Sequence, residues 1–188
     1  MRQLHKAVFL DRDGTLVKAL GGRPANVASE LELLPGVASG LRALGEHGLV
    51  LVVVTNQGGI GHGYMLEEEM PRMVQRLNEL LVAAGGPPIA RTYWCPHKTD
   101  YRCTCRKPNP ELYFQAASEL GIDLSQSFAI GDAATDMDAA TRAGIPYRII
   151  VRSDLCQDSP LARFSVPDFA EAAKIITILE VAYGGRAK

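Results

Sequence analysis

The sequence predicts a single α/β domain over residues 1–188, in which helices cover both faces of a central parallel sheet in a doubly wound arrangement. Two observations support this prediction. Short apolar runs alternate with longer amphipathic segments along the chain, which is the pattern of repeated βαβ units. The chain is also 47% hydrophobic and 22% charged, a composition typical of one globular domain of ordinary size.

Five apolar runs rich in Val, Ile and aromatic residues predict the strands of the sheet. Each run has the length of a buried strand, and most of them end in a polar residue or a glycine. Because the carboxyl ends of parallel strands meet at one edge of a sheet, we expect the functional groups to gather there. The predicted strands span residues 6–10, 49–54, 91–94, 127–130 and 147–151.

Five segments with apolar residues three or four positions apart predict the helices. Four of these segments are followed by a glycine at a position typical of a helix stop, namely Gly48, Gly85, Gly121 and Gly144. The connection at 17–34 is long for a link between a strand and a helix, and connections of that length are often functional. The predicted helices span residues 37–47, 67–84, 110–120, 135–143 and about 168–182.

Charge and hydropathy exclude several classes of partner. Twenty Lys and Arg residues stand against twenty-one Asp and Glu residues, so the net charge of −1 creates no overall field for nucleic acid or an anionic membrane. The longest apolar run, at 49–54, is far shorter than the roughly 20 residues that span a bilayer. Residues 1–10 lack the architecture of a signal peptide. We expect a cytoplasmic monomer that acts on a small molecule.

The first candidate for chemistry is the run Asp11-Arg12-Asp13-Gly14-Thr15, which directly follows the first predicted strand. Two carboxylates in this spacing can divide a reaction between them. One can attack phosphorus, while the other gives a proton to the leaving oxygen and later takes one from water. The alternatives are an acidic turn or a fragment of an EF-hand, but an EF-hand needs a preceding helix and further acids in its loop.

Three more polar runs are candidates for chemistry, two of them at the ends of predicted strands and one before a predicted helix. A Thr-Asn-Gln-Gly-Gly run begins at Thr55, where a hydroxyl and several backbone N–H groups can cradle phosphate oxygens. The basic pair Arg106-Lys107 precedes a proline and a predicted helix. Asp132 and Asp136 follow the fourth predicted strand, and carboxylate oxygens at that edge suit Mg²⁺. Taken singly, these runs are also typical of plain turns and solvated surface.

Taken in order, the four runs resemble the sequence motifs of the haloacid dehalogenase (HAD) superfamily of phosphohydrolases, over residues 6 to about 144. The resemblance implies a Rossmann-like fold of the HAD type and a Mg²⁺-dependent phosphatase that works through an aspartyl phosphate. It also implies the roles of the residues. Asp11 would be the nucleophile, Asp13 the general acid/base, and Thr55 and Lys107 the pair that stabilises the phosphoryl group. Asp11, Asp132 and the main-chain carbonyl of Asp13 would bind Mg²⁺, and Asp136 would contact these ligands without binding the ion.

The spacing of the motifs predicts whether a cap domain accompanies the catalytic domain. From Asp13 to Thr55, and again from Thr55 to Lys107, there is room for one helix, one or two strands and loops, but not for a cap domain. We therefore expect a capless enzyme. In such an enzyme, loops must exclude water and recognise the substrate, chiefly those at 17–34, 58–64 and 95–105.

The last of these loops contains a cluster of metal-binding residues. Three cysteines and one histidine lie within eleven positions, and this is a standard set for tetrahedral zinc. The alternatives are a disulfide, which a cytoplasmic chain disfavours, or buried free thiols, which would not need the histidine. We expect a structural zinc ion here, and Cys156 outside the cluster as an ordinary core or loop thiol. The expected ligands are Cys95, His97, Cys103 and Cys105.

The zinc cluster followed by Arg-Lys-Pro, together with Thr-Asn-Gln, narrows the resemblance to one branch. This branch contains the D-glycero-D-manno-heptose 1,7-bisphosphate phosphatases and the related histidinol-phosphate phosphatases. It implies that Arg106 joins Lys107 in binding phosphate, and that substrate contacts come from Thr55, Asn56, Gln57, Gly58, Arg106 and Lys107. Gly58, His62 and Ala133 depart from the pattern of the heptose enzymes, as do Val17 and Lys18. These departures concern sugar contacts rather than phosphoryl transfer.

The expected reaction is hydrolysis of the heptose 1,7-bisphosphate to the heptose 1-phosphate, and histidinol phosphate is the alternative substrate. A polynucleotide 3′-phosphatase shares part of the pattern, but it needs a basic groove that the balanced charge disfavours. A non-catalytic zinc-stabilised binding module is a further alternative. The presence of every expected carboxylate and cation argues against it.

Overall fold

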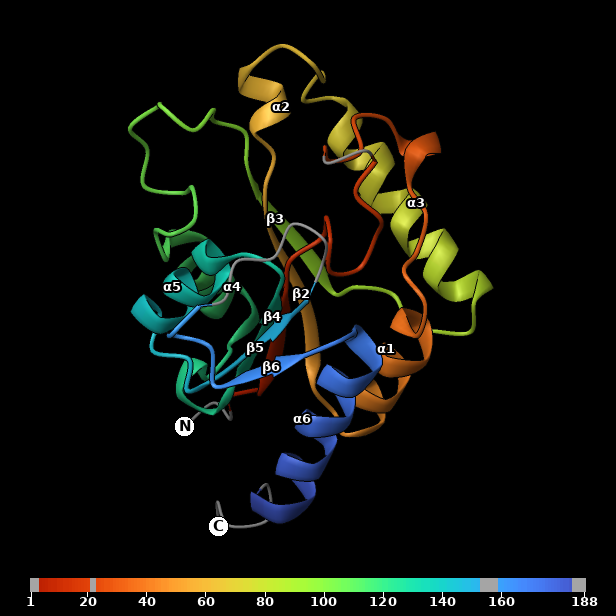
Figure 1. The fold of residues 1–188 in the computed structure, drawn as a ribbon, viewed down its shortest axis with the longest axis vertical. Helices are drawn as coiled ribbons and strands as arrows, with labels where there is room; N and C mark the ends of the chain where they lie inside the picture. Colours follow the sequence, from red (N-terminus) through yellow and green to blue (C-terminus); the bar gives the residue numbers. More distant parts are fainter. Residues whose placement is uncertain (1–3, 21–22, 153–158, 184–188) are drawn as a thin grey trace.

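The computed structural model describes residues 4–20, 23–152 and 159–183. At its centre is a six-stranded sheet with the strand order β3-β2-β1-β4-β5-β6, in which every neighbouring pair is parallel (Figure 1). This order is that of a doubly wound α/β fold, which confirms the predicted fold class. The strands are β1 Ala7–Leu10, β2 Val50–Asn56, β3 Arg91–Cys95, β4 Phe128–Gly131, β5 Tyr147–Val151 and β6 Phe164–Val166.

The described residues also form six α-helices and two short 3-10 helices. None of these helices is both long and apolar enough to cross a membrane. The α-helices are α1 Val37–Glu46, α2 Gly58–Gly61, α3 Glu69–Ala83, α4 Glu111–Leu120, α5 Ala134–Arg142 and α6 Phe169–Tyr183. The 3-10 helices are η1 Ala28–Glu30 and η2 Leu124–Gln126.

The sheet has an apolar core on each face, because successive strand residues point in opposite directions. On one face, Val8 and Val53 pack against α1, α3 and α6. On the other face, Phe9 and Val52 pack against α4 and α5. Figure 1 shows these two helical layers on opposite sides of the sheet. Burial of both faces explains why the strands read as unbroken apolar runs in the sequence.

Besides the two 3-10 helices, a short strand and a short α-helix were not expected from the sequence. β6 has three residues, which is too short for a recognisable pattern, and it forms one edge of the sheet. α2 has the sequence Gly-Gly-Ile-Gly, whose intrinsic helix propensity is poor. It lies in the segment that we expected to be a loop at 58–64. The expected helix at 67–84 also begins two residues late, at Glu69.

The strand order places a crevice at the carboxyl end of β1. β1 lies between β2 and β4, so the chain builds one half of the sheet, crosses β1 and then builds the other half. Ligands of doubly wound folds bind at this switch point, outside the carboxyl ends of the strands. Asp11 follows β1, Thr55 is near the end of β2, and Asp132 follows β4. The topology therefore brings three of the expected functional residues to one place.

The connection between β1 and α1 folds back on itself beside this crevice. Isolated bridges pair Val17 with Leu33 and Leu20 with Arg23, and η1 forms the outer turn. The described residues between β1 and β2 form only this connection and α1, and those between β2 and β3 form α2 and α3. Neither described segment contains a separately folded cap, in agreement with the spacing of the motifs.

Candidate active site

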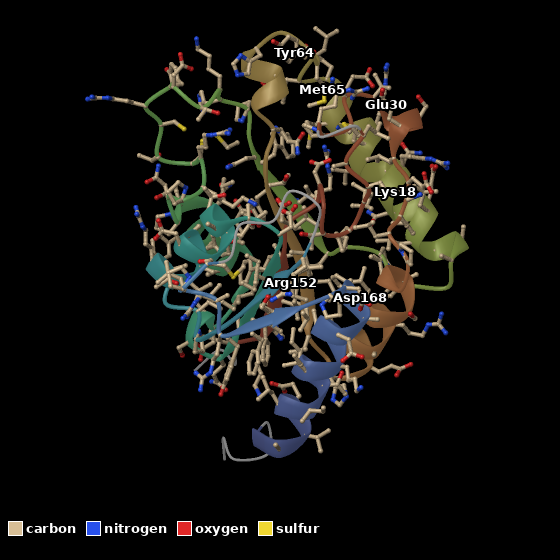
Figure 2. The ribbon with its side chains drawn as sticks, viewed as in Figure 1. Lys18, Glu30, Tyr64, Met65, Arg152 and Asp168 are labelled. Carbon is tan, nitrogen blue, oxygen red and sulfur yellow. The ribbon has the colours of Figure 1, made fainter. Side chains whose placement is uncertain are left out.

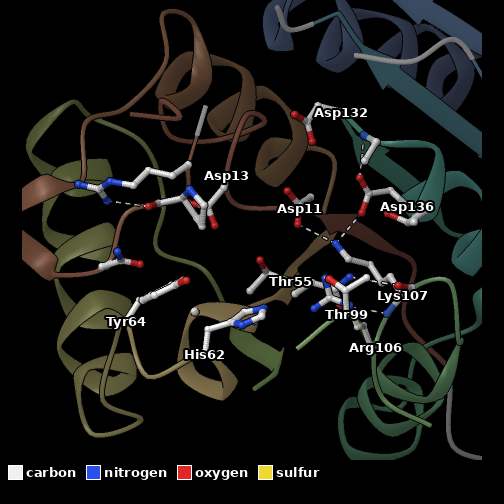
Figure 3. A pocket seen from close by; sticks show the side chains of 18 residues that line it. Asp11, Asp13, Thr55, His62, Tyr64, Thr99, Arg106, Lys107, Asp132 and Asp136 are labelled. Carbon is white, nitrogen blue, oxygen red and sulfur yellow. Dashed lines mark hydrogen bonds and ion pairs between the residues drawn. The ribbon is translucent and has the colours of Figure 1, made fainter. Parts of the chain in front are cut away.

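A cavity of about 450 Å³ opens at the carboxyl ends of β1, β2 and β4. Figure 3 shows Asp11, Thr55 and Lys107 close together at one side of it, with Asp132 and Asp136 beside them. His62 and Tyr64 lie on the opposite side. The cavity is therefore lined by acidic groups and cations together, as a site for a phosphorylated metabolite requires.

Lys107 links the nucleophile candidate to α5. Its Nζ lies 2.6 Å from Asp11 Oδ1 and 2.5 Å from Asp136 Oδ1, and it donates a hydrogen bond to the carbonyl oxygen of Val54 at 2.8 Å. Burial disfavours the charged amine, but the negative charges of Asp11 and Asp136 outweigh this effect and raise the pKa of Lys107 above its ordinary value. Lys107 is therefore a fixed positive charge beside Asp11.

Asp136 has a second contact that fixes its position. Its Oδ2 accepts a hydrogen bond from the backbone N–H of Ala133 at 3.0 Å, at the start of α5. A carboxylate is stabilised there by the helix dipole and by the free N–H groups of the first turn. A Cβ added at Gly131 would lie 2.5 Å from the Cβ of Asp136, so the glycine permits this close approach. Asp136 thus orients Lys107 from a rigid helix end.

Three carboxylates could hold a cation at this edge of the sheet. Oxygen atoms of Asp11, Asp132 and Asp136 all lie within 4.8 Å of one another. Carboxylate oxygens in such a group match the hard ligands that Mg²⁺ prefers, so the donor set fits this ion. Gly14, with φ +82°, lies directly against Asp132, because a Cβ built on it would lie 2.0 Å from Asp132 Oδ2.

The side chain of Asp13 lines the cavity but is bound from the protein side. It accepts hydrogen bonds from the guanidinium of Arg12 and from Gln57 Nε2, the latter at 2.9 Å. The buried hydroxyl of Thr55 accepts from the same Gln57 nitrogen at 2.9 Å. A hydrogen-bonded unit therefore joins the two motifs that follow β1 and β2. Arg12 and its link to Asp13 were not expected from the sequence.

Asn56 and Gln57 make contacts that differ from those expected of substrate-binding residues. The amide of Asn56 donates to the carbonyl of Lys107 at 3.1 Å and accepts from its N–H at 3.0 Å. Asn56 therefore fixes the backbone that presents Lys107, although it also lines the cavity. Gln57 is 1% exposed, and its amide faces Arg12, Asp13 and Thr55. Gly58 lines the cavity beside Arg106.

The three cysteines and the histidine expected to bind zinc lie together in the structure. The four potential ligand atoms are all within 4.8 Å of one another. The Sγ of Cys95 lies 3.1 Å from that of Cys105 and 3.7 Å from that of Cys103, and His97 Nδ1 lies 3.3 Å from Cys105 Sγ. Sulfur atoms that share a tetrahedral zinc ion are about 3.8 Å apart, so the group fits such an ion. Cys156 lies outside the described residues.

The loop at 95–105, called the cysteine loop below, also positions Arg106. The guanidinium of Arg106 donates to the carbonyl of His97 at 2.9 Å and to Thr99 Oγ1 at 3.1 Å, and it lines the cavity. The same loop contacts α2, because the N–H of Gly61 donates to the carbonyl of Pro96 at 2.8 Å. The loop therefore fixes both a cation of the site and the segment that leads to its far rim.

The far rim of the cavity is formed by a stacked pair of rings. The rings of His62 and Tyr64 are 5.5 Å apart between centroids and nearly parallel, and both residues line the cavity. Tyr64 is 72% exposed and lies beside α2 at the end of the molecule in Figure 2. Arg23 and Asn26, from the connection after β1, line the same cavity. The sequence singled out His62 as a residue, whereas Tyr64 and Arg23 were expected only as parts of the loops at 58–64 and 17–34.

The fold and the site together define the class of HAD-like phosphohydrolases. The fold is a doubly wound sheet, and the site combines Asp-x-Asp after the central strand with a strand-end Thr, a buried Lys and a following pair of Asp residues. The family model described as HAD-hydrolase-like matches residues 104–176. The chain belongs to this superfamily and, within it, to the family of the D-glycero-D-manno-heptose-1,7-bisphosphate 7-phosphatases, which confirms the resemblance and makes it a phosphoric monoester hydrolase.

Two relatives and one solved structure illustrate the similarity. The D-glycero-β-D-manno-heptose-1,7-bisphosphate 7-phosphatase of Haemophilus ducreyi is 36% identical over 79% of this chain and 84% of its own length. That of Helicobacter pylori is 33% identical over 92% and 98%. The crystal structure of D,D-heptose 1,7-bisphosphate phosphatase from B. bronchiseptica, complexed with magnesium and phosphate, has a TM-score of 0.82, 26% identity and coverage of 91% and 97%.

Proposed function

We propose that this chain removes the 7-phosphate from D-glycero-D-manno-heptose 1,7-bisphosphate and leaves the heptose 1-phosphate. The observation that supports it best is the buried Lys107, which holds Asp11 and Asp136 at the cavity where Asp132 and Thr55 also lie. Relatives similar over most of their length are named for this reaction. A cavity of about 450 Å³ is of a size suited to a sugar bisphosphate.

In the first half of the proposed reaction, a carboxylate oxygen of Asp11 attacks phosphorus. The bond from phosphorus to the sugar oxygen breaks, and Asp13 gives its proton to that leaving oxygen. In the second half, Asp13 takes a proton from water, the water oxygen attacks phosphorus, and the bond to Asp11 breaks. Inorganic phosphate leaves, and both carboxyl groups return to their starting states.

Cationic and hydrogen-bonding groups offset the repulsion between the phosphate and Asp11. Lys107 and Arg106 face the cavity from one segment, and Thr55 faces it from β2. These groups stay in place through the reaction because Asn56, Asp136 and the cysteine loop hold them. Preorganised charges of this kind stabilise a phosphoryl transition state more than water does.

We also propose two metal ions for this chain. Asp11, Asp132 and the main-chain carbonyl of Asp13 would hold Mg²⁺, and Cys95, His97, Cys103 and Cys105 would hold structural zinc. In that site, Mg²⁺ would supply positive charge that offsets the repulsion between the Asp11 carboxylate and the phosphate. Four protein ligands would leave the zinc ion no open position, so its role in this proposal is to order the loop.

The proposal is tested by the release of phosphate from four substrates in the presence of Mg²⁺. These are the α and β anomers of the heptose 1,7-bisphosphate, histidinol phosphate and a 3′-phosphorylated oligonucleotide. We expect the highest kcat/KM with one of the heptose anomers, and ³¹P NMR of the product should show that the phosphate on C7 has been lost. A higher kcat/KM with histidinol phosphate or the oligonucleotide would overturn the substrate assignment.

The proposed enzyme is a cytoplasmic monomer that does not require nucleic acid or a membrane. The balanced charge of the sequence and its relatedness to metabolic phosphatases support this part of the proposal. Light scattering behind a sizing column checks the oligomeric state, and a mass near twice that of the chain would contradict it.

A further inference from the structure

Arg12 lies between the two aspartates of the first motif, yet it is 2% exposed. A guanidinium remains charged at any pH at which a protein is folded, and a charge without a partner is costly to bury. Arg12 points beneath the connection after β1, where Nη2 donates to the carbonyl of Ala25 at 3.3 Å. The sulfur atoms of Met70 and Met73 on α3 lie 4.0 and 3.6 Å from Nη1. One end of this charged group therefore lies against methionine side chains.

The charged partner of Arg12 is the carboxylate of Asp13. Nε lies 3.0 Å from Oδ2, and Nη2 lies 3.1 Å from Oδ1 and 2.8 Å from Oδ2. These contacts use both oxygens of the carboxylate in a fork-like arrangement, which fixes the plane of the group as well as its position. Arg12 is buried on one side of this ion pair, and Asp13 lines the cavity on the other side. The Asp13 carboxylate can therefore contact a ligand only from the cavity.

Gln57 completes this arrangement. Its Oε1 accepts from Arg12 Nη2 at 2.9 Å, which forces its NH₂ group toward the other side. That group donates to Asp13 Oδ2 and to Thr55 Oγ1, both at 2.9 Å. Oδ2 thus has short contacts to Arg12 and Gln57. Oδ1 has one contact to Arg12 and a long one of 3.4 Å from the N–H of Ala25, so it is the less saturated oxygen.

We infer that Arg12 and Gln57 are positioning residues that aim the carboxyl group of Asp13 at the leaving oxygen of the substrate, with Oδ1 as the atom that carries the transferred proton. This inference rests on the proposed role of Asp13 as general acid/base. Proton transfer requires the carboxyl oxygen to lie within hydrogen-bond distance of the leaving oxygen, so a carboxyl group free to rotate loses much of its rate advantage.

The consequence can be measured through the leaving group. A sugar oxygen leaves poorly unless it receives a proton, whereas p-nitrophenolate leaves readily without one. A variant that misdirects Asp13 should therefore lose far more kcat/KM with the heptose bisphosphate than with p-nitrophenyl phosphate. Loss of stability or of phosphate binding would lower both activities by similar factors. The ratio of the activities with the two substrates therefore reports how well Asp13 is oriented toward the leaving oxygen.

The test compares Arg12→Met and Gln57→Leu with wild type on both substrates. Methionine is an uncharged chain that can pack against Met70 and Met73, and Gln57→Leu keeps the Arg12–Asp13 ion pair. We expect Arg12→Met to lower kcat/KM for the bisphosphate about 100-fold, and kcat/KM for p-nitrophenyl phosphate less than about 10-fold, since kcat/KM covers only the steps up to departure of the leaving group. A larger burst of p-nitrophenolate than in wild type should appear, because hydrolysis of the phosphoenzyme also needs Asp13. Arg12→Lys should restore part of the loss.

Two further variants separate the possible outcomes. Ile176→Ala removes a buried side chain of α6, a helix that does not carry any residue of this network, and it should lower stability while leaving the ratio of the two activities unchanged. Asp13→Asn sets the benchmark for complete loss of proton transfer. If Asp13→Asn lowers both activities equally, the proposed role of Asp13 fails. If Asp13→Asn changes the ratio but neither Arg12→Met nor Gln57→Leu does, the positioning role alone is overturned.

Discussion

Gly14 shows how a single residue can control the carboxylate group at the candidate metal site. Its φ of +82° is a conformation that residues with a side chain rarely adopt, and its Cα faces Asp132. An added methyl group would displace Asp132, because the new Cβ would lie 2.0 Å from its Oδ2. The glycine is therefore needed for two independent reasons, backbone conformation and space.

We predict that Gly14→Ala raises the Mg²⁺ concentration for half-maximal activity by about tenfold or more, through the displacement of Asp132. Titration of activity with Mg²⁺ measures this change. Gly121→Ala is a matched control, since Gly121 has φ +64° but nothing within 4 Å of an added Cβ. The control should cost about 1 kcal/mol of unfolding free energy without affecting Mg²⁺. An equal Mg²⁺ requirement in Gly14→Ala and wild type would contradict the prediction.

Asp11 is the residue whose loss should abolish turnover. Asp11→Asn replaces the attacking carboxylate with an amide, and uncatalysed hydrolysis of phosphate monoesters is extremely slow. We expect a loss of at least about 10⁴-fold in kcat, while Lys107 keeps Asp136 as a partner and the fold persists. Phosphate release from a preparation purified away from other phosphatases measures this. Appreciable turnover in that preparation would show that the covalent mechanism is wrong.

Lys107 should stabilise the fold with a defined pH dependence. Because its pKa is raised in the folded protein, its contribution is fully present below the ordinary lysine value of about 10.4 and is lost only at higher pH. Lys107→Met leaves two carboxylates without their buried cation, which should cost about 3 kcal/mol of unfolding free energy. Denaturant unfolding should give a difference from wild type that does not shrink between about pH 6 and 9. A difference that shrinks across this range would contradict the assignment.

At the scale of elements, the cysteine loop links separate parts of the site. Cys105 is followed directly by Arg106 and Lys107, so a metal ion bound to its Sγ would also restrain the backbone that carries both cations. The loop further holds the guanidinium of Arg106 through His97 and Thr99, a contact that the sequence could not predict. Gly61 of α2 packs so closely that an added Cβ would lie 2.7 Å from the backbone nitrogen of Lys98.

We predict that Cys103→Ser and Cys105→Ser lose zinc and lower turnover by about 100-fold, because a displaced cation no longer meets the phosphate. Elemental analysis should find about one zinc ion per wild-type chain and much less in the variants. Mg²⁺ activation should keep its half-maximal concentration, and added Mg²⁺ should not restore the rate. Wild-type protein prepared without chelators that lacks zinc and is fully active would contradict this.

At the scale of the whole molecule, the sequence predicted the layers of the fold and, as individual site residues, nine of the 18 residues that line the cavity. The five longer strands were visible because a sheet buried on both faces needs continuous apolar runs. β6 was not visible because three edge residues form no pattern. The contacts of Asn56, Gln57 and Arg12 were hidden for another reason: they depend on side chains that meet across different strands, and spacing along a chain does not report such meetings.

The strand order has a consequence for how the protein acquires its activity as it is made. Asp11 and Lys107, joined by an ion pair, are 96 positions apart in the chain, and Asp132 follows only after β4. β1 pairs with β4 as well as with β2, so its second neighbour is synthesised more than a hundred residues after β1 itself. A growing chain therefore has no complete set of carboxylates until most of it has left the ribosome. We therefore expect no catalysis before the second half of the sheet has been synthesised and has paired with the first.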